Sequence, residues 1–151
     1  MQATILIVDD EKHTRDGLRR LFDDAYDTSI AVDIRGALDV LEREQIDILL
    51  TDLRLAGDDG MQLVERALKL PRPPRAYFMA IAGGDMFGVR EGDWKYIYDV
   101  ASGRESLFNL QLDPDEQRDV ANGEPDLARQ LRQRVAAWVT FEDAFLWGRE
   151  N

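Results

Sequence analysis

The chain has 151 residues, a hydrophobic content of 44% and a formal net charge of -11. Its length allows one ordinary domain, or a truncated domain with a small appendage, and its apolar content is enough for a folded core. The acidic surplus argues against direct nucleic-acid binding, because phosphate backbones demand a basic surface. The sequence contains no cysteine, which excludes disulfides, thiolate nucleophiles and cysteine-bound metals.

Neither a membrane segment nor an export signal is expected. No apolar run approaches the ~20 residues that a membrane-spanning helix needs. Met1-Gln2-Ala3-Thr4 lacks a basic stretch followed by a long apolar one, so we expect no signal peptide. We therefore expect a cytoplasmic protein without a membrane partner.

The first 70 residues alternate short apolar runs with amphipathic stretches. The run Thr4-Ile5-Leu6-Ile7-Val8 is continuously apolar and β-branched, as strands buried on both faces are. A β-α-β-α-β-α rhythm implies right-handed crossovers and a parallel sheet. The predicted strands are 4–8, 28–32 and 46–53, the predicted helices are 12–25, 34–45 and 61–70, and residues 57–60 are a predicted turn.

The pattern changes at about residues 71–76, where Pro71-Arg72-Pro73-Pro74 ends the third predicted helix. Residues 76–82 are a candidate fourth strand. Closely spaced strand-like runs with turn residues between them then predict an antiparallel meander. A long helix begins at Pro125 and carries apolar residues at helical spacing. The strand-like runs are 86–90, 94–100 and 106–110, and the apolar stripe comprises Leu127, Leu131, Val135, Trp138 and Val139.

Three carboxylates follow the apolar runs of the first part. Asp9 and Asp10 end the first strand, and Asp52 ends the third. With a sheet order of 2-1-3, the carboxyl ends of these strands are adjacent and the three side chains converge. Such anions repel one another unless a cation neutralises them, and an oxygen-only site of this kind suits Mg²⁺. A carboxylate beside the metal can act as a nucleophile on phosphorus.

These residues resemble the receiver domains of two-component response regulators. The resemblance covers residues 4–74, through Ile5 to Glu11, Thr51 to Leu55, and Asp59-Gly60-Met61. It implies that Asp52 accepts phosphate from a histidine kinase or phosphotransfer protein, and that Asp9, Asp10 and Asp52 hold Mg²⁺. The backbone carbonyl of Arg54 is implied as a further ligand.

The sequence departs from the receiver pattern in two places. The family has a Thr or Ser at the end of strand four and a Lys at the end of strand five, and both contact the phosphoryl group. Ala80 stands where the hydroxyl belongs, and Arg104 stands near the expected position of the lysine. Lys95 is the only lysine after Lys69, and nothing in the sequence places it in the pocket.

Residues 75–147 resemble a different family, the C-terminal part of type I sulfatases. The resemblance is carried by Gly92 to Tyr98, Gly103 to Leu110 and Asp113 to Gln117. It implies a small antiparallel sheet with a terminal helix and brings no chemistry. The sulfatase nucleophile motif, Cys/Ser-x-Pro-x-Arg, is absent from the sequence.

The expected fold is α/β, a truncated flavodoxin-like, receiver-type sheet (1–74) continued by an antiparallel meander and a C-terminal helix (75–151), packed as one unit. The helix stripe, including Leu131, Val135 and Trp138, is expected to dock on the sheet. The expected function is a receiver-like phosphoacceptor with no enzymatic activity beyond self-phosphorylation. The alternative is a recombined or engineered chimera whose acidic pocket is inherited and idle. His13, the single histidine, is expected on the surface of the first helix.

Overall fold

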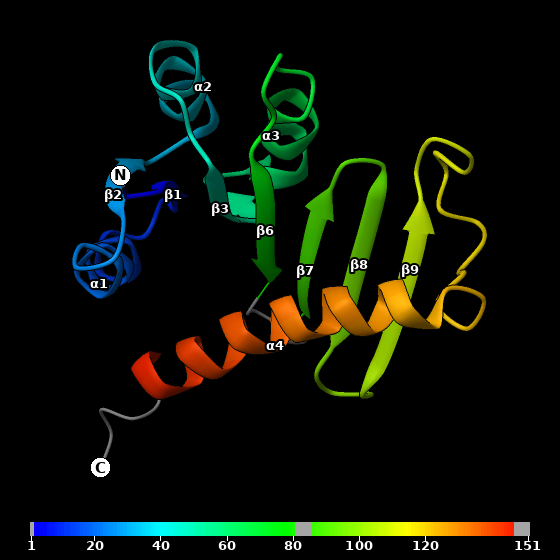
Figure 1. Cartoon of the computed structure of the whole chain (residues 1–151). Coiled ribbons are helices and arrows are strands. Elements are labelled where there is room, and N and C mark those ends of the chain that lie inside the picture. Colours follow the sequence, from blue (N-terminus) through cyan, green and yellow to red (C-terminus); the bar gives the residue numbers. More distant parts are fainter. Residues whose placement is uncertain (1, 81–85, 147–151) are drawn as a thin grey trace. The chain divides into compact units, whose positions relative to one another are not determined.

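The computed structural model describes residues 2–80 and 86–146. The chain divides into two compact units. The first unit comprises residues 1–80 with 90–92, and the second unit comprises the remaining residues. Figure 1 shows the elements in chain order, with three β-α repeats followed by further strands and a long final helix.

The elements of the first unit match the predicted alternation. Its strands are β1 (Thr4–Val8), β2 (Asp27–Ala31), β3 (Ile48–Asp52), β4 (Arg54–Leu55), β5 (Asp58–Asp59) and β6 (Arg75–Ala80). Its helices are α1 (Lys12–Phe22), α2 (Ile34–Arg43) and α3 (Gly60–Ala67). The later elements are β7 (Met86–Glu91), β8 (Trp94–Asp99), β9 (Arg104–Asn109) and α4 (Pro125–Leu146).

A parallel sheet forms the centre of the first unit. β1 lies between β2 and β3, which confirms the 2-1-3 order, and β6 pairs in parallel with the other side of β3. The candidate fourth strand therefore exists, and in register Asp52 lies opposite Met79. Because all four strands point the same way, their carboxyl ends share one edge of the sheet.

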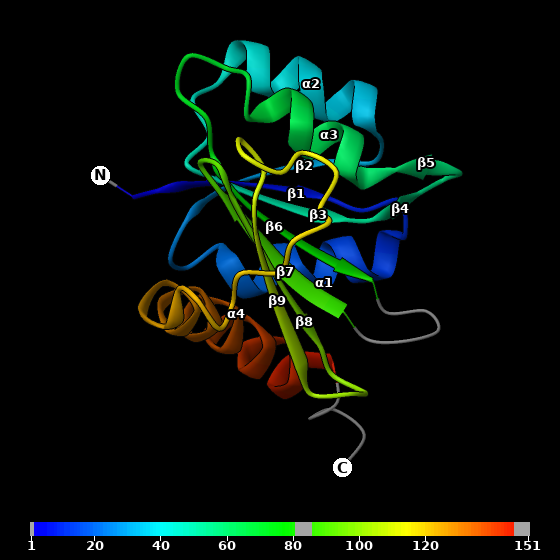
Figure 2. The same ribbon diagram turned by 90° about the vertical axis from the view of Figure 1, so that its right-hand side faces the viewer.

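Helices cover both faces of this sheet. Figure 2 shows α2 and α3 on one face and α1 on the other. Side chains alternate between the faces of a strand, so Leu6 and Val8 of β1 point toward α2 and α3 while Ile5 and Ile7 point toward the face of α1. The buried core under α2 and α3 comprises Leu6, Val8, Ala31, Ala37, Leu41, Ile46, Leu49, Leu55, Leu63, Val64, Ala67 and Ala76.

The second unit contains an antiparallel hairpin and a helix. β8 and β9 pair with Tyr96 opposite Leu107, and α4 packs against β8. Tyr96 is fully buried. Leu131 and Val135 of the predicted helix stripe have no more than 2% of their surface exposed. The side chain of Trp138, the third predicted docking residue, lies outside the described residues.

The predicted fold class is confirmed: a receiver-like parallel α/β sheet is followed along the chain by antiparallel strands and a C-terminal helix. Most of the observed element bounds differ from the predicted ones by one to three residues, and two differences lie in the first unit beside the loops and turns. The turn at 57–60 belongs to a two-stranded hairpin of β4 and β5. Helix α1 ends at Phe22 instead of residue 25, because the chain continues as turns in which the amides of Ala25 and Tyr26 both donate to the Phe22 carbonyl.

Among the described residues, no helix is long and apolar enough to cross a membrane.

Candidate functional site

The three predicted carboxylates come together at the carboxyl edge of the parallel sheet. Asp9 and Asp10 follow β1, and Asp52 is the last residue of the neighbouring strand β3. One carboxylate oxygen from each residue lies within 4.8 Å of those of the other two. The convergence that the sequence predicted from strand order is therefore present.

Asp9 is the buried member of the cluster, with only 2% of its surface exposed. Its amide donates to the carbonyl of Ala31 (3.2 Å), and its Oδ1 accepts from the amide of Glu11 (2.9 Å). Burial raises the pKa of Asp9 to about 6, against the lowering effect of the Glu11 amide and with further raising by the charges of Asp52 and Asp10. The fold thus holds a carboxylate where its negative charge is unfavourable.

The other two carboxylates accept hydrogen bonds from the β4–β5 hairpin. Asp52 Oδ1 accepts from the amide of Arg54 (3.0 Å), and Asp10 Oδ2 accepts from the amide of Ala56 (3.0 Å). Burial also raises the pKa of Asp52, opposed by the Arg54 amide and reinforced by the charge of Asp10. Ala56 has a φ of 50°, in the left-handed region that favours glycine, and the Asp10 carboxylate stabilises this turn by binding its amide.

Three features of the site were not predicted from the sequence. The first is the pair of backbone amides of the β4–β5 hairpin that bind the carboxylates. Every residue except proline has such an amide, so the sequence does not indicate which ones bind. Gly60 is the second, since a Cβ there would collide with the carbonyl oxygen of Asp52 and lie 3.0 Å from Leu53 Cα. The third is Arg15, a buried arginine on the same face of α1 as Leu18 and Phe22. A charged residue inside an apolar helical stripe was the available signal for it.

The donor set fits Mg²⁺. It consists of carboxylate oxygens, which this hard cation prefers. Asp9 Oδ2 and Asp10 Oδ1 take part in none of the hydrogen bonds of the described residues, so both are left for a cation. Burial and mutual repulsion raise carboxylate pKa values here, and a divalent cation relieves both effects. The cluster is consistent with the Mg²⁺ site of receivers.

The model of the response regulator receiver domain family matches residues 5–89, more than half of the chain. The chain belongs to this family. The receiver match continues past Pro74, in agreement with the parallel pairing of β6 on β3. A cluster of Asp9, Asp10 and Asp52 is typical of the phosphorylation site of receivers in two-component signalling.

Individual relatives point to two kinds of protein. Sporulation initiation phosphotransferase F of Bacillus subtilis is 32% identical over 84 residues, which are 55% of this chain and 68% of that protein. Arylsulfatase K of Mus musculus is 35% identical over 82 residues, 51% of this chain and 15% of that protein. The non-phosphorylated HemR receiver domain of Leptospira biflexa is 28% identical with a TM-score of 0.47, covering 51% of this chain and 63% of that one.

These matches are partial in length. The chain spans 55% or less of the length of three curated relatives that it matches.

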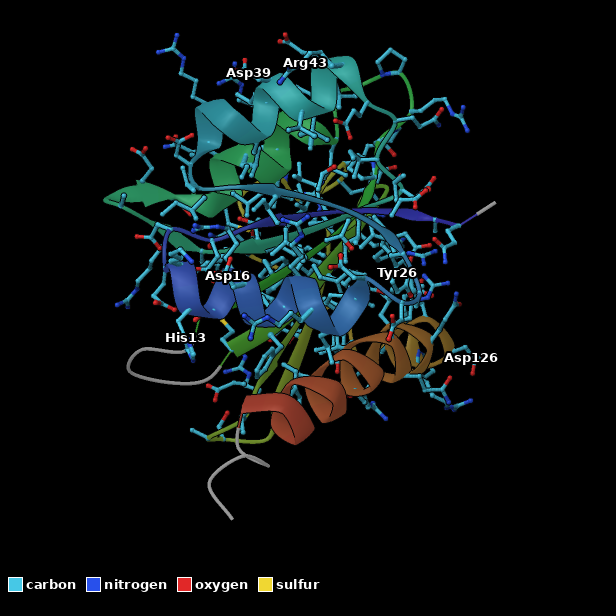
Figure 3. The ribbon with its side chains drawn as sticks, turned by 90° about the vertical axis from the view of Figure 1, so that its left-hand side faces the viewer. His13, Asp16, Tyr26, Asp39, Arg43 and Asp126 are labelled. Atoms are coloured by element: carbon cyan, nitrogen blue, oxygen red, sulfur yellow. The ribbon has the colours of Figure 1, made fainter. Side chains whose placement is uncertain are left out.

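The remaining candidate residues are described by their own elements and contacts. Ala80 ends β6, one residue beyond Met79, the partner of Asp52. The Lys95 ammonium pairs with Glu116 at 2.7 Å, and Arg104 is an exposed residue that opens β9. His13 is exposed near the start of α1, as predicted, and Figure 3 shows its side chain projecting outward from that helix.

Proposed function

We propose that this receiver domain is a Mg²⁺-dependent phosphoacceptor module with Asp52 as the acceptor. The observation that carries the proposal is the approach of three carboxylate oxygens to within 4.8 Å at the ends of β1 and β3. Asp9, Asp10, Asp52 and the backbone carbonyl of Arg54 would hold the metal. When bound, the metal would neutralise the negative charge on the oxygens of the phosphoryl group during its transfer.

The residues of the chain account for the rest of the transfer. An Asp52 carboxylate oxygen attacks the phosphorus of a phosphohistidine on the donor protein, a histidine kinase or phosphotransfer protein. The new O–P bond forms as the P–N bond breaks, and the electron pair stays on the imidazole nitrogen. The Arg54 amide, which donates to Asp52 Oδ1 at 3.0 Å, fixes the carboxylate for this attack. The product is an aspartyl phosphate.

A phosphorylation assay tests the proposal directly. The whole chain is incubated with Mg²⁺ and acetyl phosphate, and intact mass spectrometry measures the added phosphoryl group, with hydroxylamine to release an acyl phosphate. We expect one group on the wild type and none on Asp52→Asn or in EDTA. Asp58→Asn, which changes an exposed aspartate of the nearby β4–β5 hairpin, is the matched control and should be phosphorylated normally. Failure of the wild type with both acetyl phosphate and a phosphorylated histidine kinase would refute the proposal.

We also infer that phosphorylation switches little of the chain. A switch needs an element that contacts the phosphoryl group in only one of two states. Ala80 has no hydroxyl to make such a contact, and the Lys95 ammonium is engaged with Glu116. We expect beryllofluoride, a mimic of the phosphoryl group, to move amide chemical shifts only near residues 9–11 and 52–60. Shifts that propagate through 76–110 would contradict this and direct mutagenesis to Lys95 and Arg104.

The second candidate is a recombined chain whose acidic pocket is idle. The partial match to an arylsulfatase favours it, together with the antiparallel hairpin and helix of the second unit. In this interpretation the second unit derives from a sulfatase C-terminal part and is structural. A sulfatase activity has no support, because the nucleophile motif is missing from the sequence. The phosphorylation assay separates the two candidates.

A further inference from the structure

Arg15 is a buried arginine beside the acidic site. It lies on α1 with 9% of its surface exposed, on the helix face that also carries Leu18 and Phe22. Its Nη1 donates to the backbone carbonyl of Asp9 at 2.9 Å, in a buried hydrogen bond. Its Nε is buried and has no hydrogen-bond partner among the described residues. Burying a charged guanidinium costs free energy of folding, so a buried arginine at this position needs a structural or functional explanation.

The carbonyl that Arg15 binds is part of the backbone that carries two of the carboxylates. Asp9 is held at its amide by Ala31 and at Oδ1 by Glu11, and Arg15 adds a third point at its carbonyl oxygen. The same peptide group joins Asp9 to Asp10. Fixing that carbonyl therefore fixes the direction in which both carboxylates leave the backbone.

We propose that Arg15 is a positioning residue for cation binding at the Asp9/Asp10/Asp52 cluster. The inference rests on the proposed function, since it assigns Arg15 a role in the Mg²⁺ site of that function. Groups that hydrogen-bond to metal ligands without touching the metal typically contribute 10- to 100-fold to metal affinity. Arg15 acts through the backbone of the ligands and is itself no ligand.

A positional role and a purely electrostatic one predict opposite changes. Arg15 carries a positive charge close to a cation site, so charge alone would weaken Mg²⁺ binding, and removing it would tighten binding. Loss of a positional contact instead lets the Asp9–Asp10 peptide turn and weakens binding. A role in fold stability alone lowers the unfolding temperature and leaves the affinity unchanged.

The test is a calorimetric titration of the full chain with Mg²⁺, at a temperature well below the unfolding of each variant. Arg15→Met keeps the apolar stem and removes the donor and the charge. Arg15→Lys keeps the charge and replaces the planar fork by one ammonium group. Arg20→Met is the matched control, an exposed arginine of the same helix. We expect a Kd at least about tenfold higher for Arg15→Met, an intermediate Kd for Arg15→Lys, and the wild-type Kd for Arg20→Met.

An unchanged or lower Kd in Arg15→Met would overturn the proposal. If Arg15→Met does not fold, the comparison rests on Arg15→Lys, and a wild-type Kd in that variant would overturn it. The same titration distinguishes failure of the proposed function from failure of the Arg15 role alone. If the wild type binds no Mg²⁺, both fall together. If the wild type binds Mg²⁺, Asp10→Asn abolishes binding and Arg15→Met matches the wild type, then only the role of Arg15 is wrong.

Discussion

Replacing Asp9 by Asn should stabilise the metal-free receiver at neutral pH. Asn is nearly isosteric with Asp, and its side-chain oxygen can still accept the Glu11 amide at 2.9 Å. Its neutral amide group replaces a charge that repels the carboxylates of Asp10 and Asp52. The substitution thus removes a buried negative charge and keeps the hydrogen bond from the Glu11 amide.

The size of the effect follows from the pKa of Asp9, which burial raises from 3.8 to about 6. Each unit of pKa corresponds to about 1.4 kcal/mol, so the charged side chain costs the fold about 3 kcal/mol at most above pH 6. The folded state holds the Asp9 proton more tightly than the unfolded state does. This cost is therefore complete above pH 6, shrinks as the pH falls from 6 to 3.8, and disappears below 3.8.

The assay is urea unfolding in EDTA between pH 4 and pH 8, followed by far-ultraviolet circular dichroism and by NMR amide exchange in β1 and β3. The exchange data isolate the first unit. We expect the free energy of unfolding of Asp9→Asn to exceed that of the wild type by about 2–3 kcal/mol at neutral pH, with the difference fading toward pH 4. Mg²⁺ at 100 times its Kd should add about 2.7 kcal/mol to the wild type and little to the variant.

A destabilised Asp9→Asn in EDTA at neutral pH would refute the reasoning. It would mean that the Asp9 charge is already compensated within the fold, and that no cation is needed to relieve it. A stabilisation that stays constant from pH 4 to pH 8 would also refute it, because the advantage would then come from packing instead of charge.

Two further substitutions and one truncation test the local geometry. Gly60→Ala forces a Cβ onto the Asp52 carbonyl and should destabilise the first unit by about 1–3 kcal/mol while weakening Mg²⁺ binding, measured by urea unfolding and titration. A chain ending at Glu124 lacks the helix that packs on β8, so tryptophan fluorescence should report loss of cooperative unfolding in the second unit. Tyr96→Phe removes the 2.8 Å hydrogen bond to Glu105 and should cost about 1–2 kcal/mol. Burial, reinforced by Glu105, raises the pKa of Tyr96 above 10, so wild-type stability should fall above pH 10 and that of Tyr96→Phe should fall less.

The two substitutions have controls, and the truncation has an outcome that would contradict its prediction. Gly123→Ala places its Cβ at an ordinary 3.6 Å from the nearest neighbour and should leave stability unchanged. Tyr98→Phe alters a half-buried tyrosine of the same strand and should cost less than Tyr96→Phe. A wild-type unfolding curve for the chain ending at Glu124 would mean that α4 is an appendage, and an equal loss for both tyrosines would remove the special role of the Glu105 contact.

Most of the first unit could be predicted from its sequence because local and global preferences agree there. The run Ile5 to Val8 is apolar and β-branched, and the structure buries all four residues to 3% exposure or less. The 2-1-3 order was assumed from the sequence and is confirmed by the structure, and it places the end of β3 with Asp52 beside the end of β1 with Asp9 and Asp10. The convergence of the site is a consequence of topology.

The details that could not be predicted are those made by the backbone. The amides of Arg54 and Ala56 bind carboxylates irrespective of their side chains, so no residue type signals them. The β4–β5 hairpin spans only two residues per strand, too short for a periodic pattern. The end of α1 is likewise made by backbone hydrogen bonds, from the amides of Ala25 and Tyr26 to the Phe22 carbonyl.

The arrangement of donors around the site explains how three carboxylates are tolerated without a cation. Each of them accepts a hydrogen bond from a backbone amide, that of Glu11 for Asp9, of Ala56 for Asp10 and of Arg54 for Asp52. These bonds favour the charged forms, yet burial still raises the pKa of Asp9 and Asp52. The amides fix the direction of the carboxylates but do not neutralise them. The charge that remains is what a divalent cation would bind, and a receiver that had lost this function would gain stability by losing Asp9.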